Sequence, residues 1–167
     1  VAHQQHFVPA LLFRGDHAGQ GVAGPEHLAA DAFDLLERHG EDARVIAGGT
    51  ALVNLMRFGL VEPPHLISLY GVVGLNAVEV SENGLHLGAT TTHRIVETAF
   101  EVLQGWPLLA TTYHQVGSVR IRSTATVGGG LAHADPNQDP PPSLIALGAY
   151  VHVASKRGQR IIAIEEL

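Results

Sequence analysis

Apolar residues follow a helical spacing in residues 27–40, HLAADAFDLLERHG. The residues that recur on one helical face are Leu28, Ala32, Leu35 and Leu36. Gly40 comes directly after this pattern, at the position where a helix is commonly ended. A short run, ARVIA at residues 43–47, then favours a strand. The pattern therefore predicts a helix followed by a strand.

A glycine-containing turn separates this strand from a second predicted helix. Gly48-Gly49-Thr50 interrupts the run, and residues 51–59, ALVNLMRFG, return to a helical pattern. Residues 63–72, PPHLISLYGV, are typical of a short parallel strand that leaves a proline turn. The order strand, helix, strand predicts a βαβ-like lobe that ends near residue 75.

The second half of the chain mixes hairpins with helices. Apolar and polar residues alternate around Asn83-Gly84 and around Arg157-Gly158, which predicts β-hairpins at residues 77–89 and 150–164. The β-branched residues 118–129 favour a strand that runs into a second glycine cluster. Three helices are predicted here, at residues 92–103, 107–117 and 143–149.

These elements predict an α+β fold in two lobes. The first lobe spans residues 26–75 and the second, which contains the antiparallel strands, spans residues 76–167. Residues 1–25 form a leader in which glycines and histidines show no period, so we expect loop or poorly ordered structure there.

Composition excludes several functional classes. The 167 residues are 46% hydrophobic and 16% charged, as in ordinary globular proteins, and the net charge of −6 argues against a nucleic-acid or anionic-membrane surface. The chain has no cysteine, which excludes disulfides, thiol nucleophiles and cysteine-ligated iron–sulfur clusters within it. No apolar run reaches the ~18 residues that a membrane span needs, and no secretory signal opens the chain, so we expect a cytoplasmic protein.

The two glycine clusters are the strongest candidates for chemistry. Gly48-Gly49-Thr50 and Gly128-Gly129-Gly130 each follow a predicted strand, and such a turn can leave backbone N–H groups pointing at one anion. The first is explained equally well as a plain strand–helix turn, and the second as a β-bulge. Neither a GxxxxGK[ST] nor a GxGxxG motif is present. Together the clusters favour a long diphosphate ligand between the lobes.

Charged residues add little to this picture. Asp139 suits ribose or ribityl hydroxyls, or else forms an Asx turn. His93 and His133 lie near the clusters, where a loop or helix-cap role is favoured over a cofactor contact. Arg120 and Arg122 alternate on the predicted strand, where a phosphate or partner contact is one interpretation and a solvated strand face is the slightly favoured one. With no HExxH motif and no carboxylate pair suited to acid–base catalysis, we predict no catalytic residue and no metal ligand.

Five segments carry a resemblance that is far more specific than either cluster alone. They are VIAGGTALVNLM, PPHLISL, LHLGATTTHRIVE, VGSVRIRSTATVGGGLAHADPNQDPPPSLIALGAYV and RGQRIIAIEEL. In this order the chain, from about residue 28 to its end, resembles the FAD-binding subunit of the molybdenum hydroxylases. That family includes the carbon monoxide dehydrogenase medium subunits and the xanthine dehydrogenase flavin domain.

The resemblance implies a two-lobed FAD-binding fold of the vanillyl-alcohol oxidase and p-cresol methylhydroxylase type, with FAD extended between the lobes. In that fold the first loop wraps the pyrophosphate, the second loop meets the diphosphate and ribityl region, Ala89 borders the adenine side, and Asp139 binds the cofactor sugar. The cofactor-binding residues that it implies are Ala47, Gly48, Gly49, Thr50, Ala51, Leu52, Ala89, Thr126, Val127, Gly128, Gly129, Gly130 and Asp139.

The function implied is that of an FAD-binding electron-transfer subunit of a molybdopterin-dependent hydroxylase or dehydrogenase. Electrons would come from a large molybdenum-cofactor subunit through the iron–sulfur clusters of a small subunit, and would leave to NAD, a quinone or oxygen. The lack of cysteine agrees with this division of labour, because the clusters belong to the partner. The flavin carries the redox chemistry, so no acid–base residue is required.

Two alternatives remain open. Ala51 stands where the family usually has Asp or Ser, Gly130 stands where it commonly has Asn, and the chain stops where the family adds a C-terminal domain. A truncated assembly module that no longer binds FAD would fit these departures. The other alternative is an unrelated enzyme that binds a nucleotide diphosphate, although the chain has no P-loop lysine.

Overall fold

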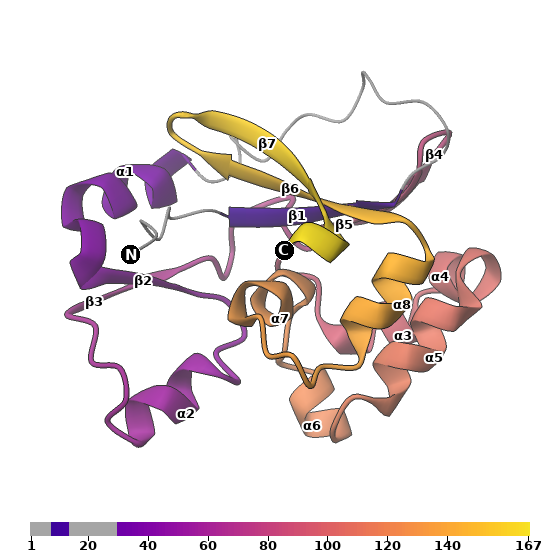
Figure 1. The fold of residues 1–167 in the computed structure, drawn as a ribbon, viewed down its shortest axis with the longest axis horizontal. Coiled ribbons are helices and arrows are strands. Elements are labelled where there is room, and N and C mark those ends of the chain that lie inside the picture. Colours follow the sequence, from indigo (N-terminus) through magenta and orange to yellow (C-terminus); the bar gives the residue numbers. More distant parts are fainter. Residues whose placement is uncertain (1–7, 14–29) are drawn as a thin grey trace.

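Two β-sheets organise the molecule (Figure 1), and the computed structural model describes residues 8–13 and 30–167. The smaller sheet pairs β2 (Ala43–Ile46) with β3 (His65–Ser68) in parallel. The larger has the order β4-β5-β1-β6-β7, and all its pairs are antiparallel. Its strands are β1 (Val8–Phe13), β4 (Val78–Ser81), β5 (Gly84–Leu87), β6 (Ala149–Ser155) and β7 (Gly158–Ala163). The α+β prediction is confirmed.

The smaller sheet is the strand pair of the predicted βαβ unit. Helix α2 (Leu52–Arg57) connects β2 to β3, and α1 (Ala30–His39) packs on this pair. The buried face of α1 and the sheet form one apolar core, which contains Ala32, Phe33, Leu36, Ala43, Ile67, Leu69, Leu75 and Ala154. The last of these belongs to β6, so this core joins the two sheets.

Both predicted hairpins are present, with turns one residue earlier than predicted. Ser81 pairs with Gly84, and Ser155 pairs with Gly158, so each loop consists of the two residues between them. The two glycines have φ of +113° and +130°, and they begin the returning strands. Lys156, in the second loop, forms ion pairs with Asp34 and Glu37 of α1.

Strand β1 contradicts the loop that was predicted across residues 1–25. Residues 8–13 lie between β5 and β6, at the centre of the larger sheet. The local sequence, VPALLF, contains a proline and no alternation, so it carries no strand pattern of its own. Its partners are strands more than 70 residues away, and that pairing makes it a strand. The rest of the predicted leader, residues 1–7 and 14–25, lies outside the described residues.

Helices α3 to α8 lie on one side of the larger sheet (Figure 1). They are α3 (His93–Thr98), α4 (Phe100–Gly105), α5 (Pro107–Gln115), α6 (Val119–Arg122), α7 (Val127–His133) and α8 (Pro140–Ala146). The helix predicted at residues 92–103 is broken at Ala99, which is extended. The helix predicted from residue 143 begins at Pro140, because proline fits the first turn of a helix. Leu85, Val96, Leu109, Leu144 and Val151 are among the residues that fill the core beneath the helices.

The strand predicted over residues 118–129 is wrong. Ser118 caps α6 by accepting a hydrogen bond from the Ile121 N–H, and a short loop then leads into α7. Arg120 and Arg122 therefore do not share a strand face: Arg120 is exposed, whereas Arg122 is buried. The alternation of apolar and charged residues was coincidental here, because buried contacts described below override the β-propensity of the segment.

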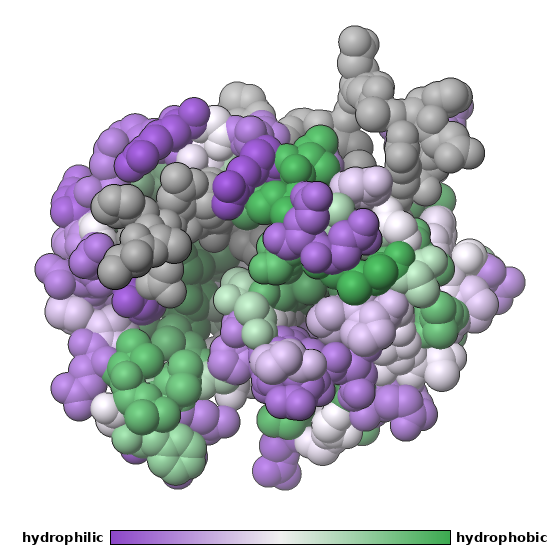
Figure 2. All heavy atoms as spheres, viewed as in Figure 1, coloured by the Kyte–Doolittle hydropathy of each residue, from purple (hydrophilic) through white to green (hydrophobic). Residues whose placement is uncertain are grey.

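Apolar residues gather on the surface over α2 (Figure 2). The exposed large apolar side chains of this helix and the turn after it are Val53, Phe58 and Leu60. Among the described residues, no helix is long and apolar enough to cross a membrane.

Candidate functional site

The candidate site is a cleft of about 760 Å³ between the β2–α2 turn and the α5–α7 segment. The first glycine loop, residues 47–52, forms one wall, and the second glycine loop, residues 126–130, contributes to the other. Figure 1 shows the turn between β2 and α2 facing α6 and α7. The fold thus brings together two loops that are more than 70 residues apart in the sequence.

The first glycine loop presents open backbone donors. Within the described part of the chain, the amides of Gly48, Gly49, Thr50 and Ala51 have no hydrogen-bond acceptor. Gly49 has a φ of +72°, which allows the chain to reverse direction into α2. The Thr50 carbonyl accepts a hydrogen bond from Asn54 Nδ2 at 3.0 Å, which anchors the loop to the helix. Successive open N–H groups of this kind form a cradle that suits an anion such as a phosphate.

The second glycine loop differs because its amides are already bonded. The N–H groups of Val127 and Gly128 donate to the carbonyls of Thr91 and Ala89, both at 2.9 Å. Gly129 N–H donates to Thr126 Oγ1, and Gly130 N–H donates to the Thr126 carbonyl. The amides of this loop are therefore not free donors, and a Cβ at Gly128 would meet Ala89 at 2.8–3.0 Å, so glycine there serves the packing of the loop.

The two walls meet at Gly48. A Cβ added at this position would lie 1.9 Å from the Thr124 carbonyl oxygen, far inside contact distance. Beyond this contact lies a second hollow of about 670 Å³, which shares Ala47, Gly48 and Thr126 with the main cleft. Its other polar lining residues include Asn76, Thr90, Thr92, Ser123 and Thr124. Gly48 therefore belongs to the lining of both hollows.

Most of the residues implied by the resemblance line the main cleft. They are Ala47, Gly48, Gly49, Thr50, Ala51, Leu52, Ala89, Thr126, Gly128, Gly129 and Gly130. Val127 is 1% exposed and belongs to the core, where its side chain anchors the second loop. Asp139 is exposed at the start of α8 and is absent from the cleft lining, although its neighbour Gln138 is present. The Asx turn considered for Asp139 is formed by Asp135 instead, whose Oδ1 accepts the Asn137 N–H at 2.9 Å.

Sequence reasoning missed several lining residues. Leu55 and Val61 from one wall, with Val116 and Ile121 from the other, add apolar surface to the cleft. The helical face of residues 51–59 could have indicated Leu55, but Val116 and Ile121 carried no local signal. Gln138 Nε2 donates to the Gly130 carbonyl at 3.0 Å, and its Oε1 lies 3.0 Å from where a Cβ at position 130 would be. Gln138 therefore occupies the space that a larger residue at 130 would need.

The charge of the cleft is low. None of its described lining residues is Asp or Glu, and Arg44 is its only arginine or lysine. Arg44 Nη1 already donates to the carbonyls of Glu41 and Ala43. No group of three or more possible metal ligands occurs among the described residues. Dipoles of the backbone, rather than side-chain charges, therefore dominate the electrostatics of this site.

Both histidines near the glycine loops line the cleft. His133 is exposed, whereas His93 is buried and packs edge-on against Tyr113, with ring centroids 4.8 Å apart. Burial lowers the pKa of His93 from 6.5 to about 4, so its ring is neutral at neutral pH. Its Nδ1 has no hydrogen-bond partner among the described residues. Its Nε2 lies 3.8 Å from where a Cβ at Gly130 would be, on the side of the second loop.

Comparison with known proteins gives a consistent picture. Residues 22–167 match the family model described as the FAD binding domain in molybdopterin dehydrogenase. The 6-hydroxypseudooxynicotine dehydrogenase complex subunit alpha of Paenarthrobacter nicotinovorans is 36% identical over 85% of this chain and 49% of its own length. The carbon monoxide dehydrogenase medium chain of Afipia carboxidovorans is 33% identical over 82% of this chain and 48% of its own length.

Solved structures show the same similarity. Quinoline 2-oxidoreductase from Pseudomonas putida 86 has a TM-score of 0.77 and 33% identity, over 86% of this chain and 48% of that chain. The Cu,Mo-CO dehydrogenase has a TM-score of 0.77 and 33% identity over 81% and 47%. The chain spans about half the length of the relatives that it matches.

Proposed function

Because the chain belongs to the family of FAD-binding domains of molybdopterin dehydrogenases, we propose that it holds FAD in the cleft as an electron-transfer flavoprotein part of a molybdopterin-dependent hydroxylase or dehydrogenase. The observation that carries this proposal is the row of open amides at residues 48–51. They suit the pyrophosphate of a dinucleotide. The described residues that line the cleft include no Asp or Glu that would repel such an anion.

Several features of the described residues support FAD as the ligand. The open amides of the first loop would hold the pyrophosphate, and Gly128, Gly129 and Gly130 would form part of the opposite wall. Leu55 and Ile121 give apolar contact from opposite walls. When bound, the flavin supplies the redox chemistry, while this chain binds and orients it. Asp139 stays a proposed contact of the cofactor sugar, although it is not among the residues that line the cleft.

We assign the lobes and partners on the same basis. Residues 26–75 form a first FAD-binding lobe and residues 76–167 a second, to which β1 adds its central strand. Relatives are named as medium chains or as a subunit of a dehydrogenase complex. We therefore expect a large molybdenum-cofactor subunit and a small iron–sulfur subunit as partners, with NAD, a quinone or oxygen as the electron acceptor.

Titration with FAD tests the function directly. The purified chain is expected to quench FAD fluorescence with 1:1 saturation and to retain a flavin absorption spectrum after gel filtration. FMN, which lacks the pyrophosphate and adenosine, serves as the matched control and is expected to bind at least tenfold more weakly, the factor that ~1.4 kcal/mol represents. A folded chain that stays colourless and leaves FAD fluorescence unchanged would instead favour the assembly-module alternative.

The low charge of the cleft leads to a second prediction. FAD affinity is expected to weaken by less than about threefold between 50 and 500 mM NaCl, because salt screens exposed charge pairs far more than buried backbone contacts. Isothermal titration at the two ionic strengths measures this. A fall of more than about tenfold would show that lysine or arginine side chains, and not the loop amides, hold the diphosphate.

A further inference from the structure

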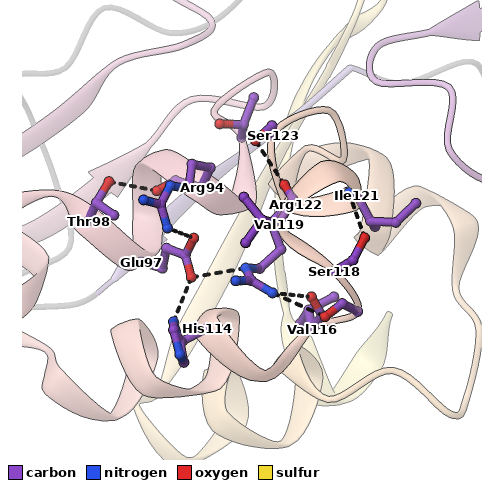
Figure 3. Close-up of polar contacts among 12 residues, drawn as sticks. Arg94, Glu97, Thr98, His114, Val116, Ser118, Val119, Ile121, Arg122 and Ser123 are labelled. Carbon is purple, nitrogen blue, oxygen red and sulfur yellow. Dashed lines mark hydrogen bonds and ion pairs between the residues drawn. The ribbon is translucent and has the colours of Figure 1, made fainter.

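Glu97 is a buried carboxylate outside the cleft. Its side chain is 1% exposed. Its carboxylate oxygens form ion-pair contacts with Arg94 Nη1 at 2.6 Å, His114 Nδ1 at 3.0 Å and Arg122 Nε at 3.0 Å. Figure 3 shows these side chains converging on it from α3, α5 and α6. Burial raises the pKa of Glu97, but the contacts with its three partners lower it more, so the net shift is downward and the group is ionised.

The three partners are not equivalent. Arg94 and His114 are 46% and 63% exposed, so water can replace either of them. Arg122 is 6% exposed, and its contact with Glu97 is an ion pair rather than an aligned hydrogen bond. A buried charge that loses its partner is strongly destabilising, so Glu97 and Arg122 constrain each other.

Arg122 also contacts the cleft wall. Its Nη1 donates to the carbonyls of Val116 and Gly117, both at 3.1 Å, and so ties the end of α5 to α6 (Figure 3). Val116 and Ile121 line the cleft. The guanidinium therefore fixes the position of the wall that faces the first glycine loop.

The wall that contains Ile121 continues to Thr124, which contacts Gly48 of the first glycine loop. The amides of Thr124 and Ala125 both donate to the Ile121 carbonyl, at 3.0 and 2.7 Å. Thr124 places its carbonyl against Gly48, and Ala125 precedes the second loop. A shift of α6 would therefore move this contact and change the separation of the cleft walls.

We propose that Glu97 is a positioning residue for the dinucleotide, which acts through Arg122 to hold the α5–α6 wall against the first glycine loop. The inference rests on the proposed flavin site but goes beyond it, because Glu97 lines neither hollow. It sets the distance between the walls without touching the ligand.

The first test is Glu97→Gln, which keeps the shape of the side chain and removes its charge. FAD is expected to bind about ten- to hundredfold more weakly, a loss typical of removing a group that supports a binding residue. Arg94→Gln is the matched control, since it removes an exposed partner of the same carboxylate, and is expected to change FAD affinity less than about threefold. Equal affinity in Glu97→Gln and the unmodified chain would overturn the proposal.

The double variant Glu97→Gln/Arg122→Met separates positioning from stability. It leaves no buried charge, so its unfolding midpoint is expected to recover above that of Glu97→Gln. FAD affinity is expected to stay weak, because the carbonyls of Val116 and Gly117 have lost their donor. If affinity recovered together with the midpoint, the pair would be merely structural and the proposal would fail.

Hydrogen exchange of the unliganded chain keeps this test independent of flavin binding. The amides of residues 116–126 are expected to exchange faster in Glu97→Gln than in Arg94→Gln, whereas those of β6, on the far side of the core, are expected to be unchanged. Equal exchange across residues 116–126 would overturn the proposal even if FAD did not bind to any variant.

Discussion

Replacing Gly48 by alanine is expected to weaken FAD binding by at least about a hundredfold. The added methyl group would lie 1.9 Å from the Thr124 carbonyl oxygen and 2.8 Å from its carbon, so either the first loop or the α6–α7 loop must move. Both atoms belong to backbone, which cannot turn aside as a flexible side chain can. A misplacement of about 1 Å can reduce the function of a preorganised site by a hundredfold, and we expect the FAD dissociation constant to rise by at least that factor.

Stability is expected to fall less than affinity. Overpacking of this kind costs about 1–3 kcal/mol, so Gly48→Ala should remain folded by circular dichroism at 20 °C. Gly105→Ala is the matched control: no atom lies within 4 Å of its added Cβ, and the residue ends α4. Alanine is the better helix former there, so stability and FAD affinity should be kept. Unaltered FAD affinity in Gly48→Ala would show that the first glycine loop does not have to touch the α6–α7 loop at Thr124.

Acidification is expected to destabilise the chain from pH 6.5 downward because of His93. The unfolded chain takes up a proton near the ordinary pKa of 6.5, whereas the folded chain does so only near 4. The contribution of neutral His93 to the free energy of unfolding is therefore fully present above pH 6.5. Below pH 6.5 it falls by about 1.4 kcal/mol per pH unit, and it is lost by pH 4, which amounts to about 3 kcal/mol in total. Urea unfolding at intervals between pH 7 and pH 4 measures this slope.

The variant His93→Phe identifies the residue responsible. In this variant the unfolding free energy is expected to change less steeply with pH between 6.5 and 4, by an amount that corresponds to the uptake of up to one proton. The phenyl ring keeps the packing on Tyr113. Some slope remains, because burial also lowers the pKa of His86 and His152. The exposed His133, changed to Gln, serves as control. An identical slope in His93→Phe and the unmodified chain would contradict the prediction.

Local patterns predicted the elements whose stability is local. The Asn83-Gly84 and Arg157-Gly158 signals predicted both hairpins, helical spacing predicted α1, and the helix predicted at residues 107–117 is present as α5. Strand β1 was missed because its hydrogen-bonding partners lie in β5 and β6. The segment 118–129 was assigned the wrong element, because no pattern near Arg122 shows that its guanidinium pairs with a carboxylate 25 residues earlier.

The sequence by itself determined the family and placed glycine where the first glycine loop meets Thr124, since only a residue without Cβ tolerates the contact at Gly48. It could not show that the loops play unequal parts. The amides of the first loop are open, whereas carbonyls and a hydroxyl from residues 89, 91 and 126 already satisfy those of the second. Hydrogen-bond satisfaction depends on which distant backbone atoms meet, and only the tertiary structure decides that.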